Sequence, residues 1–232
     1  MSSPARIAPK PAPPTKPKRA FGWILVMIVV LAGDAGLAYM ADRARLREEA
    51  RAEAEQIQRV RMTYGAFRGL KVNAVVADLL NTRREDVLRF YDSYTQDREI
   101  SHLLTAFALA YDIPVHYFVA LAWAESRFRP GAINGHKNQN GTTDYGLLQL
   151  NSAEFPDDTP EFLMDLGHNI RIGADHLDAF YRRYGDWTEA LISYNAGTGT
   201  SVARSSVRHV ADILEYSYGL DEAFVERFLR EE

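Results

Sequence analysis

The chain has 232 residues, 47% hydrophobic and 25% charged, which is enough for one well-packed domain with additional segments. Its formal net charge of −4 gives no basic footprint of the kind that nucleic-acid-binding proteins carry, so we expect no nucleic-acid partner. The chain has no cysteine and its six histidines show no spacing such as HExxH, which excludes disulfides and Cys-ligated metal sites and predicts no metal and no cofactor.

The first 41 residues divide into a basic tail and an apolar segment. Residues 1–20 hold six of the ten prolines, five Lys or Arg and no acid, a composition that predicts a disordered tail. Residues 21–41, "FGWILVMIVVLAGDAGLAYMA", are apolar except for Asp34 and carry Trp23 and Tyr39 near their ends, as a single transmembrane helix does. The basic, acid-free side should face the cytoplasm, which places the rest of the chain outside it.

Two alternatives to this uncleaved anchor stay open. The apolar run before Gly33 is short enough for a signal peptide, and Gly36-Leu37-Ala38 has the small-x-small pattern of a cleavage site. The segment could also be a helix of the protein core. Asp34 would be costly in the middle of a bilayer, but it lies toward the outer end of the segment.

Residues 42–100 are expected to form a helical stalk and membrane-proximal region. The stretch from Asp42 to Met62 is rich in helix formers, and Glu53 interrupts a heptad pattern of apolar residues. The heptad positions are Leu46, Ala50, Ile57, Val60, Tyr64 and Phe67. A solvated stalk and a short homo-oligomeric coiled coil both fit this pattern, so the oligomeric state stays open. Residues 68–100 look helical and show no chemistry.

A mainly helical domain is predicted from residue 101 to residue 232. It begins with "SHLLTAFALAY", an amphipathic helix. Pro114 is well placed to open a second helix, which should run to about Phe128 before Pro130 stops it.

A small β-hairpin and further helices are expected in the rest of this domain. The Gly- and Asn-rich loop after the second helix contains Asn140-Gly141, a dipeptide typical of hairpins. Residues 169–184 have a helical period, and Asn169 at their start is interpreted as a helix cap. Asp186 and Glu189 form a capping box for the helix that follows.

Glu125 is the one carboxylate in the nearly unbroken apolar stretch "LAWAESRFRP" (121–130). In a helix it shares a face with four apolar residues, Phe118, Leu121, Ala122 and Phe128. A buried charge must be paired, neutralised or used, and the negative end of the helix dipole together with apolar surroundings favours a protonated carboxyl. That state suits a general acid, whereas the structural alternative is an ion pair with Arg129 one turn further on.

The stretch that begins at Glu125 resembles the lysozyme-like muramidase superfamily. "ESRFRPGAINGHKNQNGTTDYGLLQLNS" has a Glu-Ser pair at a helix end, a Gly- and Asn-rich loop and then Asp-Tyr-Gly-Leu-Leu-Gln-Leu-Asn. Later, "NIRIGADHL" (169–177) and "ALISYNAG" (190–197) are similar to the third and fourth motifs of the soluble lytic transglycosylase group. The resemblance covers roughly residues 103–216, and four motifs in one order are specific.

The resemblance implies a membrane-anchored lytic transglycosylase that acts on peptidoglycan glycan strands in the bacterial periplasm. In this family the Glu of the Glu-Ser pair protonates the glycosidic oxygen between N-acetylmuramic acid and N-acetylglucosamine. The same carboxylate then takes the proton of the muramoyl C6 hydroxyl, so that a 1,6-anhydro sugar forms without water. Glu125 matches this acid/base. The implied substrate-binding residues are Ser126, Asp144, Gly146, Gln149, Tyr194 and Asn195.

Asp144 keeps a second reaction open, because "TTDYGLLQLNS" also resembles animal c-type lysozymes, where an Asp at this position is the second carboxylate of a retaining hydrolase. The c-type disulfides are absent here, and "YNAG" belongs to the transglycosylases. Some transglycosylases attached to secretion machines carry the same Asp, so an envelope-spanning machine is a candidate partner. The alternatives are a hydrolytic muramidase that uses Glu125 and Asp144, and a noncatalytic peptidoglycan-binding scaffold, against which the intact Glu125 argues.

Overall fold

The computed structural model describes residues 40–45, 47, 48, 51, 55, 72–134, 141–196 and 204–230. The chain divides into two units, Met1–Ala52 and Glu53–Glu232, and the described residues of the first unit are helical. The predicted tail, the predicted anchor up to residue 39 and all six heptad positions lie outside the described residues. Within the described part of the chain, no helix is both long and apolar enough to cross a membrane.

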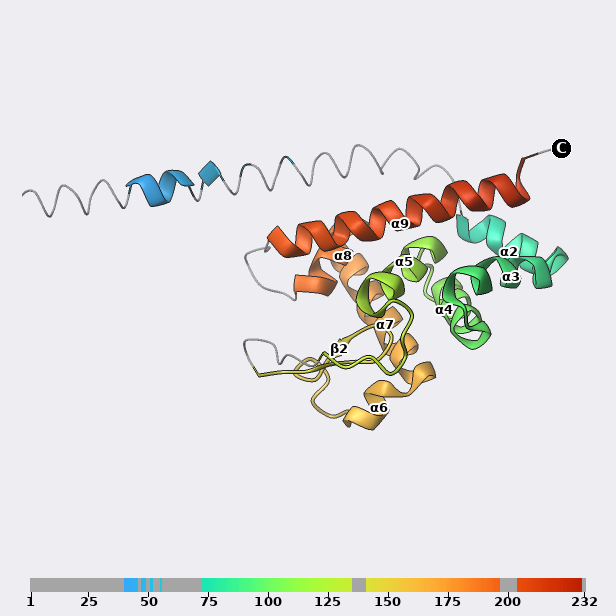
Figure 1. Cartoon of the computed structure of the whole chain (residues 1–232), viewed down its shortest axis with the longest axis horizontal. Helices are drawn as coiled ribbons and strands as arrows, with labels where there is room; N and C mark the ends of the chain where they lie inside the picture. Colours follow the sequence, from blue (N-terminus) through green and yellow to red (C-terminus); the bar gives the residue numbers. More distant parts are fainter. Residues whose placement is uncertain are drawn as a thin grey trace, which may run out of the picture. The chain divides into compact units, whose positions relative to one another are not determined.

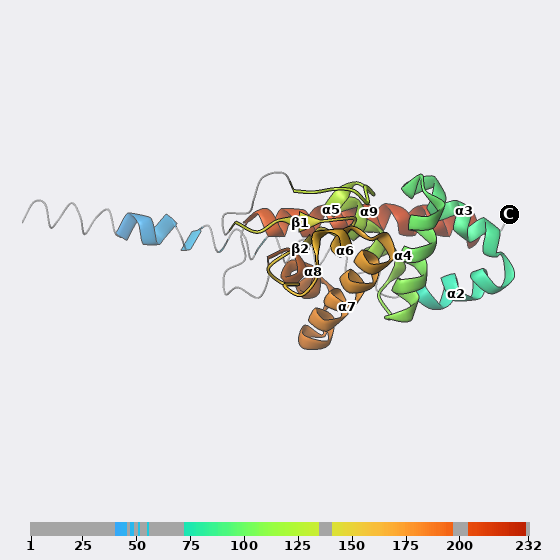
Figure 2. The same cartoon turned by 90° about the horizontal axis from the view of Figure 1, so that it is seen from below.

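The second unit is mainly helical and carries a two-stranded antiparallel sheet, which confirms the predicted helical domain with a small hairpin (Figure 1). Its elements in chain order are α2 (Val72–Thr82), α3 (Arg84–Thr95), α4 (Arg98–Ala110), α5 (Val115–Ser126), β1 (Asp144–Tyr145), β2 (Leu150–Asn151), α6 (Pro160–Met164), α7 (Leu166–Tyr184), α8 (Trp187–Ala196) and α9 (Arg204–Phe228). Figure 2 shows the same unit turned by 90°.

The central helix α5 is buried along most of its length. It begins after Pro114, as predicted, and ends at Ser126 rather than at about Phe128. The reason is local, because Arg127 and Phe128 have φ values of 57° and 58°, in the left-handed region that ends helices. Glu125 therefore lies in the last turn of a helix whose apolar residues form the core.

Helices α2 and α3 pack against α5 and α4 respectively, so the packed part of the unit already includes Val72. Asn73 on α2 braces the turn before α5. Its Nδ2 donates to the carbonyl of Ile113 at 2.9 Å, and its Oδ1 accepts from the amide of Val115 at 3.0 Å. These bonds fix the start of the helix that carries Glu125.

The 25-residue helix α9 packs against α5 and α8. Its N-terminal half lies beside α8 and its C-terminal half beside α3, where Phe224 and Phe228 contact Phe90 (Figures 1 and 2). No boundaries were predicted for this helix from the sequence. Because α9 packs along α5 from His116 to Glu125, it contributes side chains both to the core and to the surroundings of Glu125.

A buried polar chain links α3, α5 and α9 through Tyr91, His116 and Asp221. The Tyr91 hydroxyl lies 3.0 Å from His116 Nε2, and His116 Nδ1 lies 2.5 Å from Asp221 Oδ1. Burial, with a smaller contribution from the negative charge of Asp221, raises the pKa of Tyr91 well above its ordinary value, so the phenol stays protonated. Hydrogen bonds as well as apolar contacts therefore hold α9 against α5.

The small sheet pairs Asp144 with Asn151 and Tyr145 with Leu150. Its turn spans residues 146–149, with positive φ at Gly146 (77°) and Gln149 (47°). A further bridge joins Ile133 to Tyr145. Of the dipeptide that predicted a hairpin, Asn140 lies outside the described residues. The hairpin that the structure does describe turns a few residues later in the chain.

Candidate active site

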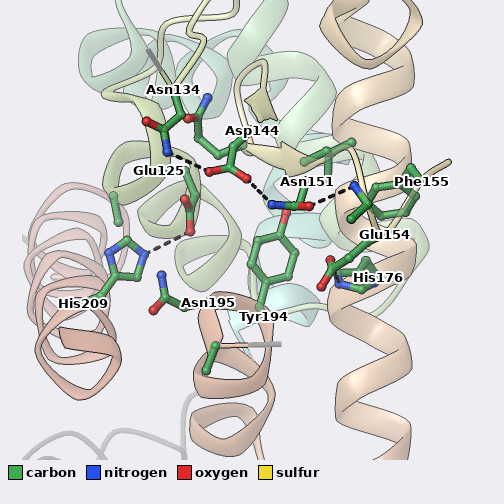
Figure 3. Close-up of a pocket in the computed structure, with 15 residues that line it drawn as sticks. Glu125, Asn134, Asp144, Asn151, Glu154, Phe155, His176, Tyr194, Asn195 and His209 are labelled. Carbon is green, nitrogen blue, oxygen red and sulfur yellow. Dashed lines mark hydrogen bonds and ion pairs between the residues drawn. The ribbon is translucent and has the colours of Figure 1, made fainter. Parts of the chain in front are cut away.

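A cleft of about 830 Å³ lies where the end of α5, the hairpin, α7, α8 and the first turns of α9 meet (Figure 3). Five of the predicted site residues line it: Glu125, Asp144, Gln149, Tyr194 and Asn195. They come from three separate stretches of the chain, α5, the hairpin and α8, and the fold brings them to one cleft. The other two predicted site residues, Ser126 and Gly146, lie outside this lining.

The Glu125 side chain is 12% exposed and points into the cleft (Figure 3). Its Oε1 lies 3.0 Å from His209 Nε2 on α9. Arg129 Nε donates instead to the carbonyl of Ser126 at 2.8 Å, so among the described residues His209, and not Arg129, is the ionic partner of Glu125. The alternative interpretation of Glu125 as half of a helical ion pair with Arg129 is therefore wrong.

Asp144 faces the same cleft from β1, and both of its carboxylate oxygens are held by amides. Asn134 Nδ2 donates to Oδ2 at 3.0 Å, and Asn151 Nδ2 donates to Oδ1 at 2.6 Å (Figure 3). Asn151 is also the partner of Asp144 across the two strands. The carboxylate is thereby fixed in orientation and bound into the hairpin.

Tyr194 and Asn195 lie at the end of α8. The Tyr194 hydroxyl donates to the carbonyl of Leu148 at 2.9 Å, which ties α8 to the turn of the hairpin. Burial, and then the negative charges of Glu125, Glu154 and Asp144, raise the pKa of Tyr194 well above its ordinary value. Tyr194 is therefore a protonated hydrogen-bonding group at neutral pH. Asn195 is exposed in the cleft.

The start of α8 agrees with the predicted cap. Asp186 Oδ1 accepts from the amides of Thr188 at 2.8 Å and Glu189 at 3.2 Å, the arrangement expected of a helix N-cap. The capping bonds at one end of this short helix help to set the position of Tyr194 and Asn195 at the other.

Gln149 lines the cleft but also binds its own turn. Its Nε2 donates to the carbonyl of Gly146 at 2.8 Å and to that of Ala132 at 3.2 Å. These bonds support the left-handed backbone at Gln149 and connect the hairpin turn to the segment before the loop. The side chain therefore shapes the wall of the cleft on which it lies.

Ser126 and Gly146 have packing roles beneath the cleft. Ser126 is buried, and its hydroxyl donates to Ala122 and accepts from the amide of Arg129, which supports the turn after Glu125. A Cβ added at Gly146 would lie 2.3 Å from Asn169 Nδ2 and 2.9 Å from the Leu163 carbonyl. Only glycine therefore fits at position 146.

Asn169 is a buried clamp and not a helix cap. Helix α7 begins at Leu166, where Asp165 accepts from the amide of His168, so the cap lies one turn earlier than predicted. The Asn169 side chain is fully buried and makes three hydrogen bonds to backbone groups. It accepts from the amide of Leu148 (2.8 Å) and donates to the carbonyls of Tyr145 (2.9 Å) and Leu163 (2.7 Å).

Glu154, Phe155 and His176 line the far end of the cleft (Figure 3). His176 Nε2 lies 3.1 Å from Glu154 Oε2, and the His176 ring packs edge-on against Phe155 and Tyr194. These residues were not among the site residues predicted from the sequence, and neither were Asn134, Asn151 and His209. Among the residues that the structure describes, no cluster of His, Asp or Glu is arranged to hold a metal ion.

The family model described as "Transglycosylase SLT domain" matches residues 103–213. Protein IpgF of Shigella flexneri is 31% identical over 44% of this chain and 70% of IpgF. Invasion protein IagB of Salmonella typhimurium (strain LT2) is 36% identical over 42% of this chain and 62% of IagB. X polypeptide of Escherichia coli (strain K12) is 36% identical over 43% of this chain and 63% of that protein. No solved structure matches the chain.

Replacing Asn169 by Ala should destabilise the unit strongly, because three backbone groups lose their partner at a fully buried position. Each buried group left unsatisfied costs about 1–3 kcal/mol, so we expect a loss of about 3 kcal/mol or more in the free energy of unfolding. Urea unfolding followed by circular dichroism measures it. The matched control is Asn81→Ala at an exposed position of α2, which should change stability by less than about 0.5 kcal/mol. Equal urea midpoints of unfolding for Asn169→Ala and Asn81→Ala would contradict the proposed role of the Asn169 hydrogen bonds.

Proposed function

Since the chain belongs to the Transglycosylase SLT domain family, we propose that it is a peptidoglycan lytic transglycosylase with Glu125 as its acid/base. The proposed reaction cleaves the β-1,4 bond between N-acetylmuramic acid and N-acetylglucosamine and leaves a 1,6-anhydro terminus. The observation that carries the proposal is the place of Glu125, a largely buried carboxyl that opens into a polar cleft at the end of the core helix α5.

One carboxyl group is sufficient for both proton transfers of this reaction. Glu125 first donates its proton to the glycosidic oxygen, so that the leaving N-acetylglucosamine departs with a hydroxyl group. The resulting carboxylate then accepts the proton of the muramoyl C6 hydroxyl as that oxygen bonds to C1. Glu125 ends the cycle in the protonation state in which it began, and no water enters the product.

The polar groups around Glu125 suit a sugar that carries hydroxyl and N-acetyl groups. Asn195 presents an exposed amide beside the catalytic carboxyl, and Gln149 and Asp144 line the facing wall. Oriented groups of this kind bind a glycan by hydrogen bonds and hold the scissile bond near the acid. We propose that these residues position the glycan strand, while Tyr194 supports the wall through Leu148.

A hydrolytic muramidase is the second candidate because Asp144 lines the same cleft as Glu125. In a retaining hydrolase the second carboxylate lies about 5 Å from the acid and attacks or stabilises the sugar. Here both oxygens of Asp144 accept hydrogen bonds from Asn134 and Asn151. That arrangement favours a carboxylate that shapes the hairpin, and it supports the transglycosylase over the hydrolase.

We also propose that residues 21–41 anchor the chain in the bacterial inner membrane with the catalytic unit in the periplasm. The basic residues before this segment and its apolar run support the proposal. The chain spans 62% of IagB, which is named an invasion protein. Asp144 resembles an Asp of some transglycosylases attached to secretion machines, so we also propose a partner in an envelope-spanning machine. Crosslinking of the full chain in intact envelopes, followed by mass spectrometry, would test for such a partner.

Alkaline phosphatase fused after Glu232 should be active, because this enzyme folds only outside the cytoplasm and the basic residues 1–20 hold the opposite end inside. The matched control places the same reporter after Ala20, where it should be inactive. Activity of the control but not of the first fusion would reverse the proposed topology. A soluble chain starting near Tyr39 would establish the cleaved-signal alternative.

Glu125→Gln should abolish cleavage of purified sacculi while leaving the fold intact, because a neutral amide cannot donate and recover the proton. General acid/base assistance is worth about 10²- to 10⁴-fold, so the rate should fall by at least about 100-fold. Turbidity loss of the sacculi measures the rate. Glu215→Gln, an exposed position of α9 outside the cleft, is the control and should keep the wild-type rate. More than about a tenth of the wild-type rate in Glu125→Gln would contradict the assignment.

Mass spectrometry of the released muropeptides tests the proposed function directly. We expect 1,6-anhydro termini, with no ¹⁸O incorporated from labelled water. Asp144→Asn should slow cleavage much less than Glu125→Gln does. Its main effect is that the new amide N–H group faces an amide donor of Asn134 or Asn151, which weakens one hydrogen bond of the hairpin by about 1 kcal/mol. Reducing termini that contain ¹⁸O, together with loss of activity in Asp144→Asn, would instead place Asp144 in the catalytic pair.

A further inference from the structure

His209 is the one residue of the described cleft that makes a direct hydrogen bond to Glu125. It comes from α9, its side chain is 22% exposed, and its Nε2 lies 3.0 Å from Glu125 Oε1 (Figure 3). This contact places Oε1 of Glu125 within proton-transfer distance of the imidazole. The proposed reaction assigns no role to the imidazole of His209.

We propose that His209 is a positioning residue that orients the carboxyl of Glu125 and stores the proton that Glu125 delivers to the glycosidic oxygen. This inference rests on the proposed function. The proton leaves His209 Nε2 as the O–H bond of the Glu125 carboxyl forms, and it passes from that carboxyl to the glycosidic oxygen. The C6 hydroxyl proton then moves to Glu125 and returns to Nε2, so the pair has the same number of protons before and after each cycle.

The charges around His209 support a stored proton. Burial acts to lower the pKa of His209, but the hydrogen bond and the negative charge of Glu125, helped by Asp212 on α9, outweigh it. Arg127, just after α5, acts in the opposite direction. From α8 the neighbours that line the cleft are Asn195 and Ala196, which are uncharged. The pKa of His209 is therefore raised, and the imidazole keeps its proton to a higher pH than an ordinary histidine does.

The pair gives the reaction a defined pH range. Below the pKa of His209 the pair holds at least one proton, which Glu125 can deliver. Above that pKa the pair holds none, so the rate should fall as the pH rises through it. Without His209 only the carboxyl's own proton remains, and carboxyl groups ordinarily ionise at lower pH than imidazoles do. The alkaline limb of the pH profile should then lie at lower pH.

The test compares pH profiles of sacculus cleavage by the full chain, wild type and His209→Gln. Gln keeps an N–H donor near the position of Nε2 but cannot titrate in this range. We expect the alkaline limb of His209→Gln to move by about one pH unit or more toward acid. The matched control is His168→Gln, which changes another histidine–carboxylate pair, with Asp158, outside the cleft, and should keep the wild-type profile. An unchanged limb in His209→Gln with active wild type would overturn the proposal.

A second measurement does not depend on activity. NMR titration of the full chain labelled with ¹⁵N-histidine should show His209 titrating above the ordinary histidine range in the wild type. In Glu125→Gln burial outweighs the remaining charges, so the pKa of His209 should drop by about one unit or more. Inactive wild type would refute the proposed function alone, whereas the same His209 titration in wild type and Glu125→Gln would refute the stored proton even if the enzyme is active.

Discussion

The cleft depends on one buried side chain, Asn169, whose three hydrogen bonds hold the hairpin turn against α7. No water can easily replace them in a fully buried place, and the turn approaches so closely that Gly146 admits no Cβ. At Gly173, likewise, a Cβ would lie 2.3 Å from Leu148. The same hairpin turn offers the Leu148 carbonyl to the hydroxyl of Tyr194 on α8. The Asn169 side chain therefore aligns the hairpin with both α7 and α8.

The opposite wall is built by two helices, α5 and α9, that pack side by side. Helix α5 is buried among apolar side chains and ends where two residues take left-handed conformations, which leaves Glu125 in its last turn. Helix α9 packs along α5 and supplies His209 at this end. The acid thus sits between a rigid hairpin wall, whose Asp144 is held by two amides, and a helix that offers a titratable partner. The proposed catalysis by a single carboxyl agrees with this arrangement, in which hydrogen bonds hold Asp144 in the hairpin and Glu125 contacts a titratable histidine.

Local features were predictable from the sequence and long-range contacts were not. The helical period predicted α4, α5 and most of α7. The Asp186 cap was predictable because a helix cap involves only residues a few positions apart in the sequence. Asn169 looked like a cap because it stands where the apolar period begins, yet Asp165 caps α7 and Asn169 reaches Leu148, 21 positions earlier in the chain. His209 lies 84 positions after Glu125, on a helix with no recognised motif, so only tertiary packing could bring the two together.

The central claim is that the Glu125 carboxyl reaches the bond that is cleaved, and a crystal structure of Glu125→Gln with a bound tetrasaccharide of alternating N-acetylglucosamine and N-acetylmuramic acid tests it most directly. Because the variant cannot complete proton transfer, the uncleaved glycan should stay in the cleft. The account predicts that the glycosidic oxygen after N-acetylmuramic acid lies about 3 Å from the side chain of residue 125, with the glycan against the hairpin wall. A glycan bound with every glycosidic oxygen beyond hydrogen-bond reach of residue 125, even through one water, would contradict it.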